Sequence, residues 1–299
     1  MRLIVLRAIA VLLLAFVGAC GNDATTPLLP PPPPPPPPVL QDGLWTVSGS
    51  PAAILRLEPT QLTDTGQRDP ATIVTTPSAG LTTLAGVAFD AAGNLWIASD
   101  DDSLLLAFAP GALSSSGFKP ARTVIRPTRG SLSGPIGLAF DSRQRLWVVN
   151  HQSATLVRFD PAQLAASGSP PAAFVLTAAD SLVNPTGLAF DAAGNLWVAN
   201  HGRSNLLAFT PAQLSGTGPL EPNVVIRSNA GSLGIPIGLA FEEDGSLWVV
   251  GGTGVLTKFA RASLGASGAP APSARLKVSG HVVFWSVALW PKPAGLPLN

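Results

Sequence analysis

The sequence predicts an all-β protein, specifically a β-propeller built from blades of about 50 residues. Five Leu-Trp pairs recur, with their tryptophans 51, 51, 50 and 51 residues apart. Each pair opens an apolar run too short for a helix and bounded by Gly, Pro, Asn or Ser, which favours strands. A fixed period of this length made of short strands is typical of propellers and stacked β repeats. The repeated tryptophans are Trp45, Trp96, Trp147, Trp197 and Trp248.

Each copy of the repeat contains four predicted strands. In one copy they are 195–200, 206–209, 224–226 and 236–241. The strands on which the repeat region begins and ends predict how the propeller closes. The chain enters on the strand with Trp45 and leaves on 286–289, a variant of the Gly-Leu-Ala-Phe strand that precedes the other tryptophans. If that strand is the innermost of a blade, the two ends complete one blade, the propeller closes without an open edge, and the count is five blades.

A short helical segment is expected between the second and third strands of each copy. It opens with proline, or with Arg261 in the last copy, and closes with glycine. Proline at a first helical position, with Asp160 or Thr210 before it as N-cap, predicts one or two turns. A leucine recurs in each segment and is expected to pack onto the sheet, since an apolar residue at a fixed repeat position faces the core. These are Leu62, Leu113, Leu164, Leu214 and Leu264.

The repeat resembles the NHL repeat. In residues 185–200 a Pro-Thr-Gly-Leu-Ala-Phe-Asp stretch leads through a Gly turn into Leu-Trp-Val-Ala-Asn, as an NHL repeat leads from Pro-x-Gly-Ile-Ala-x-Asp into Tyr-Val-Ala-Asp. The pattern recurs at Gly86, Gly137 and Gly238 and covers most of residues 42–290. NHL-like propellers usually have six blades, which is the alternative to five. Related propellers include gluconolactonase-like enzymes, streptogramin lyases and domains that only bind.

The N-terminus predicts a lipid anchor. Residues 1–19 combine Arg2 and Arg7 with an apolar run and end before Cys20, the single cysteine. This is the pattern of a bacterial lipoprotein signal peptide, with a plain secretory signal or an uncleaved anchor as the alternative. Gly21 after the cysteine favours the outer membrane of the cell envelope, by resemblance to the lipoprotein sorting rule.

Residues 20–41 are predicted to link the acylated cysteine to the propeller, which occupies 42–299. Nine consecutive prolines begin at Pro30. They predict a polyproline II rod roughly 30 Å long, at about 3.1 Å per residue, that acts as a spacer. A docking motif for a proline-binding domain is the alternative.

The charge excludes a nucleic-acid partner. The chain has 18 Lys and Arg against 17 Asp and Glu, a formal net charge of +1 that becomes about −1 without residues 1–19. With one cysteine there is no intrachain disulfide, so apolar burial must hold the propeller together. We expect a monomer.

Candidate functional residues follow the strand that holds the repeated Trp, and here the sequence of the repeat stops being uniform. The residue four after each tryptophan is Gly49, Asp100, His151, His201 or Gly252. We expect three adjacent blades to bring one set of polar side chains to one mouth of the central channel: Asp100, Asp101, Asn150, His151, Asn200 and His201. Imidazole and carboxylate groups suit acid–base chemistry or a divalent metal, which Asp100, His151 and His201 would hold. The alternative is structural, with both asparagines bonding the loop backbone and both histidines solvated.

At the opposite mouth, an acid recurs in a turn, and ordinary hairpin chemistry explains it. These acids are Asp90, Asp141, Asp191 and Glu242.

The function predicted is a membrane-anchored binding scaffold for a protein, peptide or glycan, with no cofactor. The alternatives are a metal-dependent, lactonase- or lyase-like hydrolytic propeller and a five-bladed lectin. Gly49 and Gly252 at two of the five blade positions argue against a converging set of metal ligands.

Overall fold

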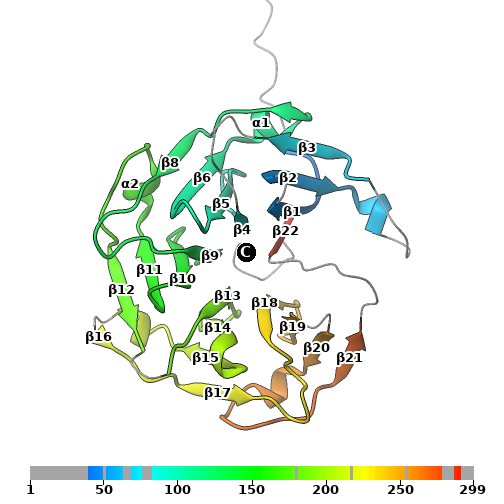
Figure 1. The fold of residues 1–299 in the computed structure, drawn as a ribbon. Helices are drawn as coiled ribbons and strands as arrows, with labels where there is room; N and C mark the ends of the chain where they lie inside the picture. The colour runs from blue at the N-terminus through cyan, green and yellow to red at the C-terminus, as the bar shows by residue number, and fades with distance from the viewer. Residues whose placement is uncertain are drawn as a thin grey trace, which may run out of the picture. The chain divides into compact units, whose positions relative to one another are not determined.

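The computed structural model describes residues 40–49, 52–62, 69–75, 83–178, 181–215, 218–252, 255–277 and 286–290. All of them belong to one compact unit, Pro37–Asn299. The predicted signal peptide, Cys20 and the proline run lie outside the described residues. In this unit the sheets are arranged radially around a common centre (Figure 1).

The described strands form an all-β propeller of five blades, as the sequence predicts, with four antiparallel strands in each blade. From the innermost strand outward, blade 1 contains β22 (Val287–Trp290), β1 (Gly43–Gly49), β2 (Ala52–Leu57) and β3 (Thr72–Thr75). Blade 2 contains β4 (Leu84–Phe89), β5 (Leu95–Ser99), β6 (Leu104–Phe108) and β8 (Thr123–Ile125). Blade 3 contains β9 (Pro135–Phe140), β10 (Leu146–Asn150), β11 (Thr155–Phe159) and β12 (Phe174–Thr177). Blade 4 contains β13 (Pro185–Phe190), β14 (Leu196–Asn200), β15 (Asn205–Phe209) and β17 (Val224–Arg227). Blade 5 contains β18 (Pro236–Phe241), β19 (Leu247–Gly251), β20 (Val255–Phe259) and β21 (Ala274–Lys277).

Blade 1 draws strands from distant parts of the chain. Strand β22 pairs antiparallel with β1, and Leu289 lies opposite Leu44. This is the register in which Phe140 lies opposite Leu146 in blade 3. Strand β22 therefore takes the innermost place in blade 1 that β9 takes in blade 3 (Figure 1).

The apolar core lies at the joints between blades. At each of four joints, the Trp of one blade contacts edge-on a Phe from the innermost strand of the next, with ring centroids 6.0 to 6.3 Å apart. Such T-shaped pairs are stabilising beyond the area that they bury. Each pair lies within its own cluster of buried residues. The pairs are Trp45–Phe89, Trp96–Phe140, Trp147–Phe190 and Trp197–Phe241.

The acid of each turn has a second role that the sequence analysis did not foresee. Its carboxylate accepts a hydrogen bond from the indole N–H of the Trp six residues later, at 3.1 Å for Asp90, Asp141 and Asp191. Glu242 accepts from Trp248 in the same way. In blade 4 the other carboxylate oxygen of Asp191 accepts the turn N–H groups of Ala193 and Asn195. The acid thus fixes the turn and orients the indole.

Trp45 is the exception, because its blade has no such turn. The chain enters blade 1 directly at β1, and its innermost strand comes from the other end of the described chain. The indole N–H of Trp45 is buried, and none of the residues that the structure describes accepts a hydrogen bond from it. A buried donor without an acceptor costs stability.

The helical segments are present after the third strand of the blades, counted from the centre. Their leucines are buried where the segment's side chains are described, namely Leu113, Leu164, Leu214 and Leu264. The segments contain η1 (Pro59–Leu62), α1 (Pro110–Leu113), α2 (Pro161–Leu164), η3 (Gln213–Ser215) and η4 (Arg261–Ser263), while η2 (His201–Arg203) lies in a loop. No helix among the described residues is long and apolar enough to cross a membrane.

After its helical segment, the chain reaches back to the preceding blade. Gly117 of β7 (Gly117–Phe118) pairs in parallel with Val74 of β3, and Gly218 of β16 (Gly218–Pro219) pairs with Leu176 of β12. Single bridges join Ile125 to Gly168 and Ile226 to Gly268 in the same manner. These contacts add backbone hydrogen bonds between neighbouring blades at the outer edge.

Replacing Trp197 by Phe should destabilise the protein more than replacing Trp45 by Phe. Both changes remove the same atoms from a buried site, but only Trp197→Phe breaks the hydrogen bond to a carboxylate, that of Asp191. We expect the free energy of unfolding to fall by about 1 to 2 kcal/mol more for Trp197→Phe, measured by urea denaturation. Equal losses would show that the bond between the indole and the acid adds nothing to the joint.

Candidate functional site

The loops that follow the second strands carry the candidate side chains to one mouth of the propeller. Asp100, His151 and His201 come directly after β5, β10 and β14. These strands belong to three adjacent blades. The turns with Asp90, Asp141 and Asp191 lie at the opposite ends of the same strands.

His151 is held by two backbone groups. Its N–H donates to the Gly134 carbonyl at 2.9 Å. Its Nδ1 lies 3.0 Å from the carbonyl oxygen of Pro185 in the next blade. Because a carbonyl can only accept, Nδ1 carries a proton and donates it to Pro185.

His201 stacks on His151 and has no partner of its own for one ring nitrogen. The two imidazole centroids are 6.4 Å apart, with an angle of 24° between the planes. The Nδ1 atom of His201 is buried and finds no hydrogen-bond partner among the described residues. Burial, and to a lesser degree the neighbouring His151, lowers the pKa of His201 below its ordinary value of 6.5. His201 is therefore neutral at pH 7, and a protonated Nδ1 would be a free donor to a ligand.

Asp100 lies on the other side of His151. Its Oδ1 atom is buried, and no residue in the described part of the chain forms a hydrogen bond with it. Burial raises the pKa of Asp100 above its ordinary value of 3.8, the negative charge of Asp101 raises it further, and His151 acts in the opposite direction. A Cβ added at Gly134 would lie 2.7 Å from this oxygen, so glycine leaves the room that Asp100 occupies.

Asn150 and Asn200 have a structural role. The Asn200 side-chain amide donates to the Ser181 carbonyl at 2.8 Å, and its oxygen accepts the Val183 N–H at 2.7 Å. The Asn150 amide makes the equivalent bonds to Ser131 and Ser133. Both side chains are almost fully buried. These contacts agree with the structural alternative, in which both asparagines bond the loop backbone. The oxygen and the nitrogen of each side-chain amide are used in these bonds.

Asp101 accepts a hydrogen bond from the Thr83 hydroxyl at 2.5 Å, so it braces the loop beside Asp100. The structure thus brings Asp100, His151 and His201 into one row. Among the residues described, no group of three or more His, Cys, Asp or Glu side chains is arranged to hold a metal ion.

Sequence reasoning missed the two backbone partners of this row. The packing of the next blade brings the Pro185 carbonyl to His151, and the strand pairing within blade 3 brings the Gly134 carbonyl. The repeated Pro-x-Gly at the start of the innermost strand was the available signal, but it was interpreted only as part of the strand.

The comparisons with known proteins identify the fold alone. No protein-family model matches the chain, and no curated protein matches it in sequence. A streptogramin B lyase structure matches with a TM-score of 0.52 at 12% identity, covering 82% of this chain and 71% of that one. A Bacteroides caccae protein of unknown function matches with a TM-score of 0.50 at 12% identity, covering 82% and 77%. A virginiamycin B lyase from Staphylococcus aureus matches with a TM-score of 0.49 at 12% identity, covering 81% and 69%. The chain is a β-propeller structurally similar to these lyase propellers.

Replacing Asp100 by Asn should stabilise the protein at neutral pH. Folding raises the pKa of the Asp100 carboxyl above its ordinary value of 3.8. The free energy of unfolding therefore falls as the pH rises above 3.8, and this loss persists at pH 7. Because Asp100 is partly exposed, we expect the gain at pH 7 to be no more than about 1 kcal/mol. Urea denaturation of both proteins at pH 3 and pH 7 checks this. A gain at pH 3 as large as that at pH 7 would contradict the assignment.

Proposed function

We propose that this protein is a lipid-anchored binding propeller whose ligand contacts the mouth formed by Asp100, His151 and His201. One observation carries the proposal. Three buried side-chain nitrogen or oxygen atoms lack a hydrogen-bond partner in the described part of the chain. One belongs to Trp45, whose blade lacks its turn, and the other two are Oδ1 of Asp100 and Nδ1 of His201. Unpaired buried polar atoms are costly, and a bound ligand that pairs with them recovers that cost.

The arrangement favours binding over hydrolysis. The His201 imidazole stays neutral at pH 7, and the Nδ1 of His151 is already bonded to the Pro185 carbonyl. A donor–acceptor row of this kind orients a polar, neutral ligand such as a sugar or a peptide group. Covalent catalysis would need a nucleophilic hydroxyl or thiol, which Asp100, His151 and His201 do not supply. A metal-bound water would need a set of ligands, and no group of three or more His, Cys, Asp or Glu among the described residues is arranged to hold a metal ion.

The anchor supports a position in the bacterial cell envelope. The basic start, the apolar run and Cys20 indicate an acylated N-terminus, and Gly21 favours the outer membrane. The proline run would hold the propeller away from the lipid surface. A binding domain on a stiff spacer can then meet ligands or partner proteins beyond the headgroups.

Arrays of glycans and of short peptides test the binding proposal, with the detergent-solubilised protein as probe. We expect the His151→Ala/His201→Ala double variant to lose binding to the array ligands that the parent protein binds. Because His151→Ala also removes the hydrogen bond to the Pro185 carbonyl, the free energy of unfolding should fall by about 1 to 2 kcal/mol, and the double variant should stay folded. Arg143→Ala, at an exposed position at the opposite mouth, is the matched control and should retain binding to the same array ligands.

A double variant that retains every array interaction of the parent would show that the mouth is not the site. Stoichiometric zinc, calcium or magnesium that is lost in the double variant would favour the hydrolytic alternative instead.

Replacing Cys20 by Ser should abolish lipid attachment. Without the thiol that receives the acyl group, the protein should accumulate as an unprocessed precursor or appear in the soluble fraction. Membrane fractionation with radiolabelled palmitate checks this. A processed, lipid-labelled Cys20→Ser protein would contradict the lipoprotein proposal.

A further inference from the structure

A position in the third strand of each blade alternates between a cation and alanine. This residue lies beside the repeated Trp in the neighbouring strand, as Arg158 lies opposite Trp147 and Ala208 lies opposite Trp197. Blades 1, 3 and 5 carry a positive charge here, whereas blades 2 and 4 carry a methyl group. Around the propeller the residues are Arg56, Ala107, Arg158, Ala208 and Lys258.

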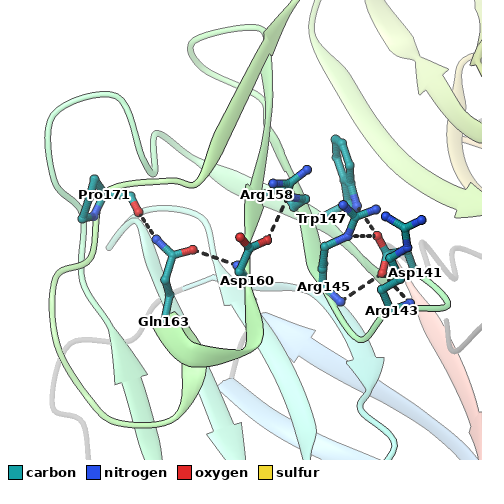
Figure 2. A network of polar contacts seen from close by, with 8 residues as sticks. All are labelled: Asp141, Arg143, Arg145, Trp147, Arg158, Asp160, Gln163 and Pro171. Carbon is teal, nitrogen blue, oxygen red and sulfur yellow. Dashed lines mark hydrogen bonds and ion pairs between the residues drawn. The ribbon is translucent and has the colours of Figure 1, made fainter. Parts of the chain in front are cut away.

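The three cations lie over the indole faces. The Arg158 guanidinium carbon lies 5.8 Å from the centroid of Trp147, and both residues are drawn in Figure 2. The same carbon lies 5.4 Å from the centroid of Phe174. The Arg158 Nε donates to a carboxylate oxygen of Asp160 at 3.0 Å. Arg56 and Lys258 lie 6.0 and 5.7 Å from the centroids of their own tryptophans, and each pairs with a glutamate. In blades 1, 3 and 5, therefore, a cation occupies this position between an indole face and a carboxylate.

Blades 2 and 4 leave the same space open. Cavities of about 290 and 280 Å³ lie there, lined by Trp96 with Ala107 and by Trp197 with Ala208. Both tryptophans keep 3% of their surface exposed, whereas Trp147, under its own arginine, is at 0%. Ala208 lies between Trp197 and Val224 in the register in which Arg158 lies between Trp147 and Phe174. An arginine side chain at position 208 would occupy this space.

The two cavities differ in charge. Asp191 and Glu243 line the blade 4 cavity together with Arg261, which leaves it one net negative charge. The blade 2 cavity is lined by Asp90 and Arg122, whose charges cancel. Asn223 is the blade 4 equivalent of Arg122, since each precedes the first residue of its blade's outermost strand. The blade 4 cavity is therefore the one suited to a cation.

We propose that the blade 4 cavity binds an alkylguanidinium or alkylammonium group over Trp197, in the place that Arg158 fills in blade 3. The site lies at the turns that hold Asp191 and Glu243, at the opposite mouth from Asp100, His151 and His201. It is independent of the ligand proposed there. The cation can come from a free small molecule or from an arginine or lysine side chain of a peptide.

Indole N–H resonances of the full-length, detergent-solubilised protein test this proposal by NMR. The Trp197 resonance is assigned by comparison with Trp197→Phe. We expect n-butylguanidinium to shift this resonance saturably. The isosteric but uncharged n-butylurea should bind at least roughly fivefold more weakly, as expected for a cation–π contact. Equal binding of the two compounds, or no shift of the Trp197 resonance, would overturn the proposal.

Matched variants separate the cavity from a general effect of charge. Ala208→Arg should remove butylguanidinium binding, because the new side chain fills the space. The same change in blade 2, Ala107→Arg, should leave it intact. Glu243→Gln, on an exposed turn, should weaken butylguanidinium without affecting butylurea. Binding that survives Ala208→Arg in the folded variant, or that is equally reduced by Ala107→Arg, would overturn the proposal.

A further titration identifies the source of the cation. The peptide acetyl-Gly-Arg-Gly-amide is compared with its citrulline analogue and with butylguanidinium. Tighter binding of the arginine peptide than of butylguanidinium would support the site and assign it to a peptide side chain. Exclusion of the peptide with retention of butylguanidinium would support the site and assign it to a free small molecule. Equal binding of the arginine and citrulline peptides at the cavity would count against a cation site.

Discussion

The propeller depends on one contact repeated at its joints, the edge-on packing of a Trp from one blade on a Phe from the next. At four joints the ring centroids are 6.0 to 6.3 Å apart, each pair surrounded by its own apolar cluster. A blade alone is a small twisted sheet with two apolar faces, and it cannot bury them without neighbours. The joint therefore explains why Leu-Trp recurs with so constant a period. It also explains why an acid precedes each of the last four repeat tryptophans, Trp96, Trp147, Trp197 and Trp248, by six residues, since that acid accepts the hydrogen bond of the indole N–H.

Positions outside this joint are free to vary, and the variation is where specific chemistry arises. At one mouth, a single repeat position is glycine, aspartate or histidine, and three adjacent blades bring Asp100, His151 and His201 together. Beside the indoles, another position is cationic in blades 1, 3 and 5 and alanine in blades 2 and 4. The uniform part of the repeat makes the scaffold, and the non-uniform part makes the two candidate sites at opposite mouths.

Much of the architecture could be predicted from the sequence, because each blade repeats the same local pattern. Period, strand length, Gly turns and the leucine of the helical segment are local features, so five blades and four strands per blade followed directly. The partners of the site residues depend instead on how neighbouring blades meet. Nothing local to His151 indicates the Pro185 carbonyl, 34 residues away, that accepts its Nδ1–H. Asn150 and Asn200 looked like site residues because they adjoin histidines, but their amides complete the loops. The acids before the tryptophans were predicted as turn residues, and their bond to the indole became visible only with the strand register.

The fifth joint, between blade 5 and blade 1, departs from the other four. Leu289 of β22 lies opposite Leu44 in the register in which a Phe lies opposite Leu in blades 2 and 3. Ala240 of β18 is exposed and Trp248 of β19 half-buried, whereas their equivalents in blades 2 to 4 are buried. If Trp–Phe packing is what stabilises the joints, blade 5 should open at a lower free energy than blades 3 and 4. Native-state hydrogen exchange measures this directly. The account predicts that the bonded amides of β18 and β19 exchange faster than those of β9, β10, β13 and β14 at low denaturant. Equal protection in all these strands would contradict it.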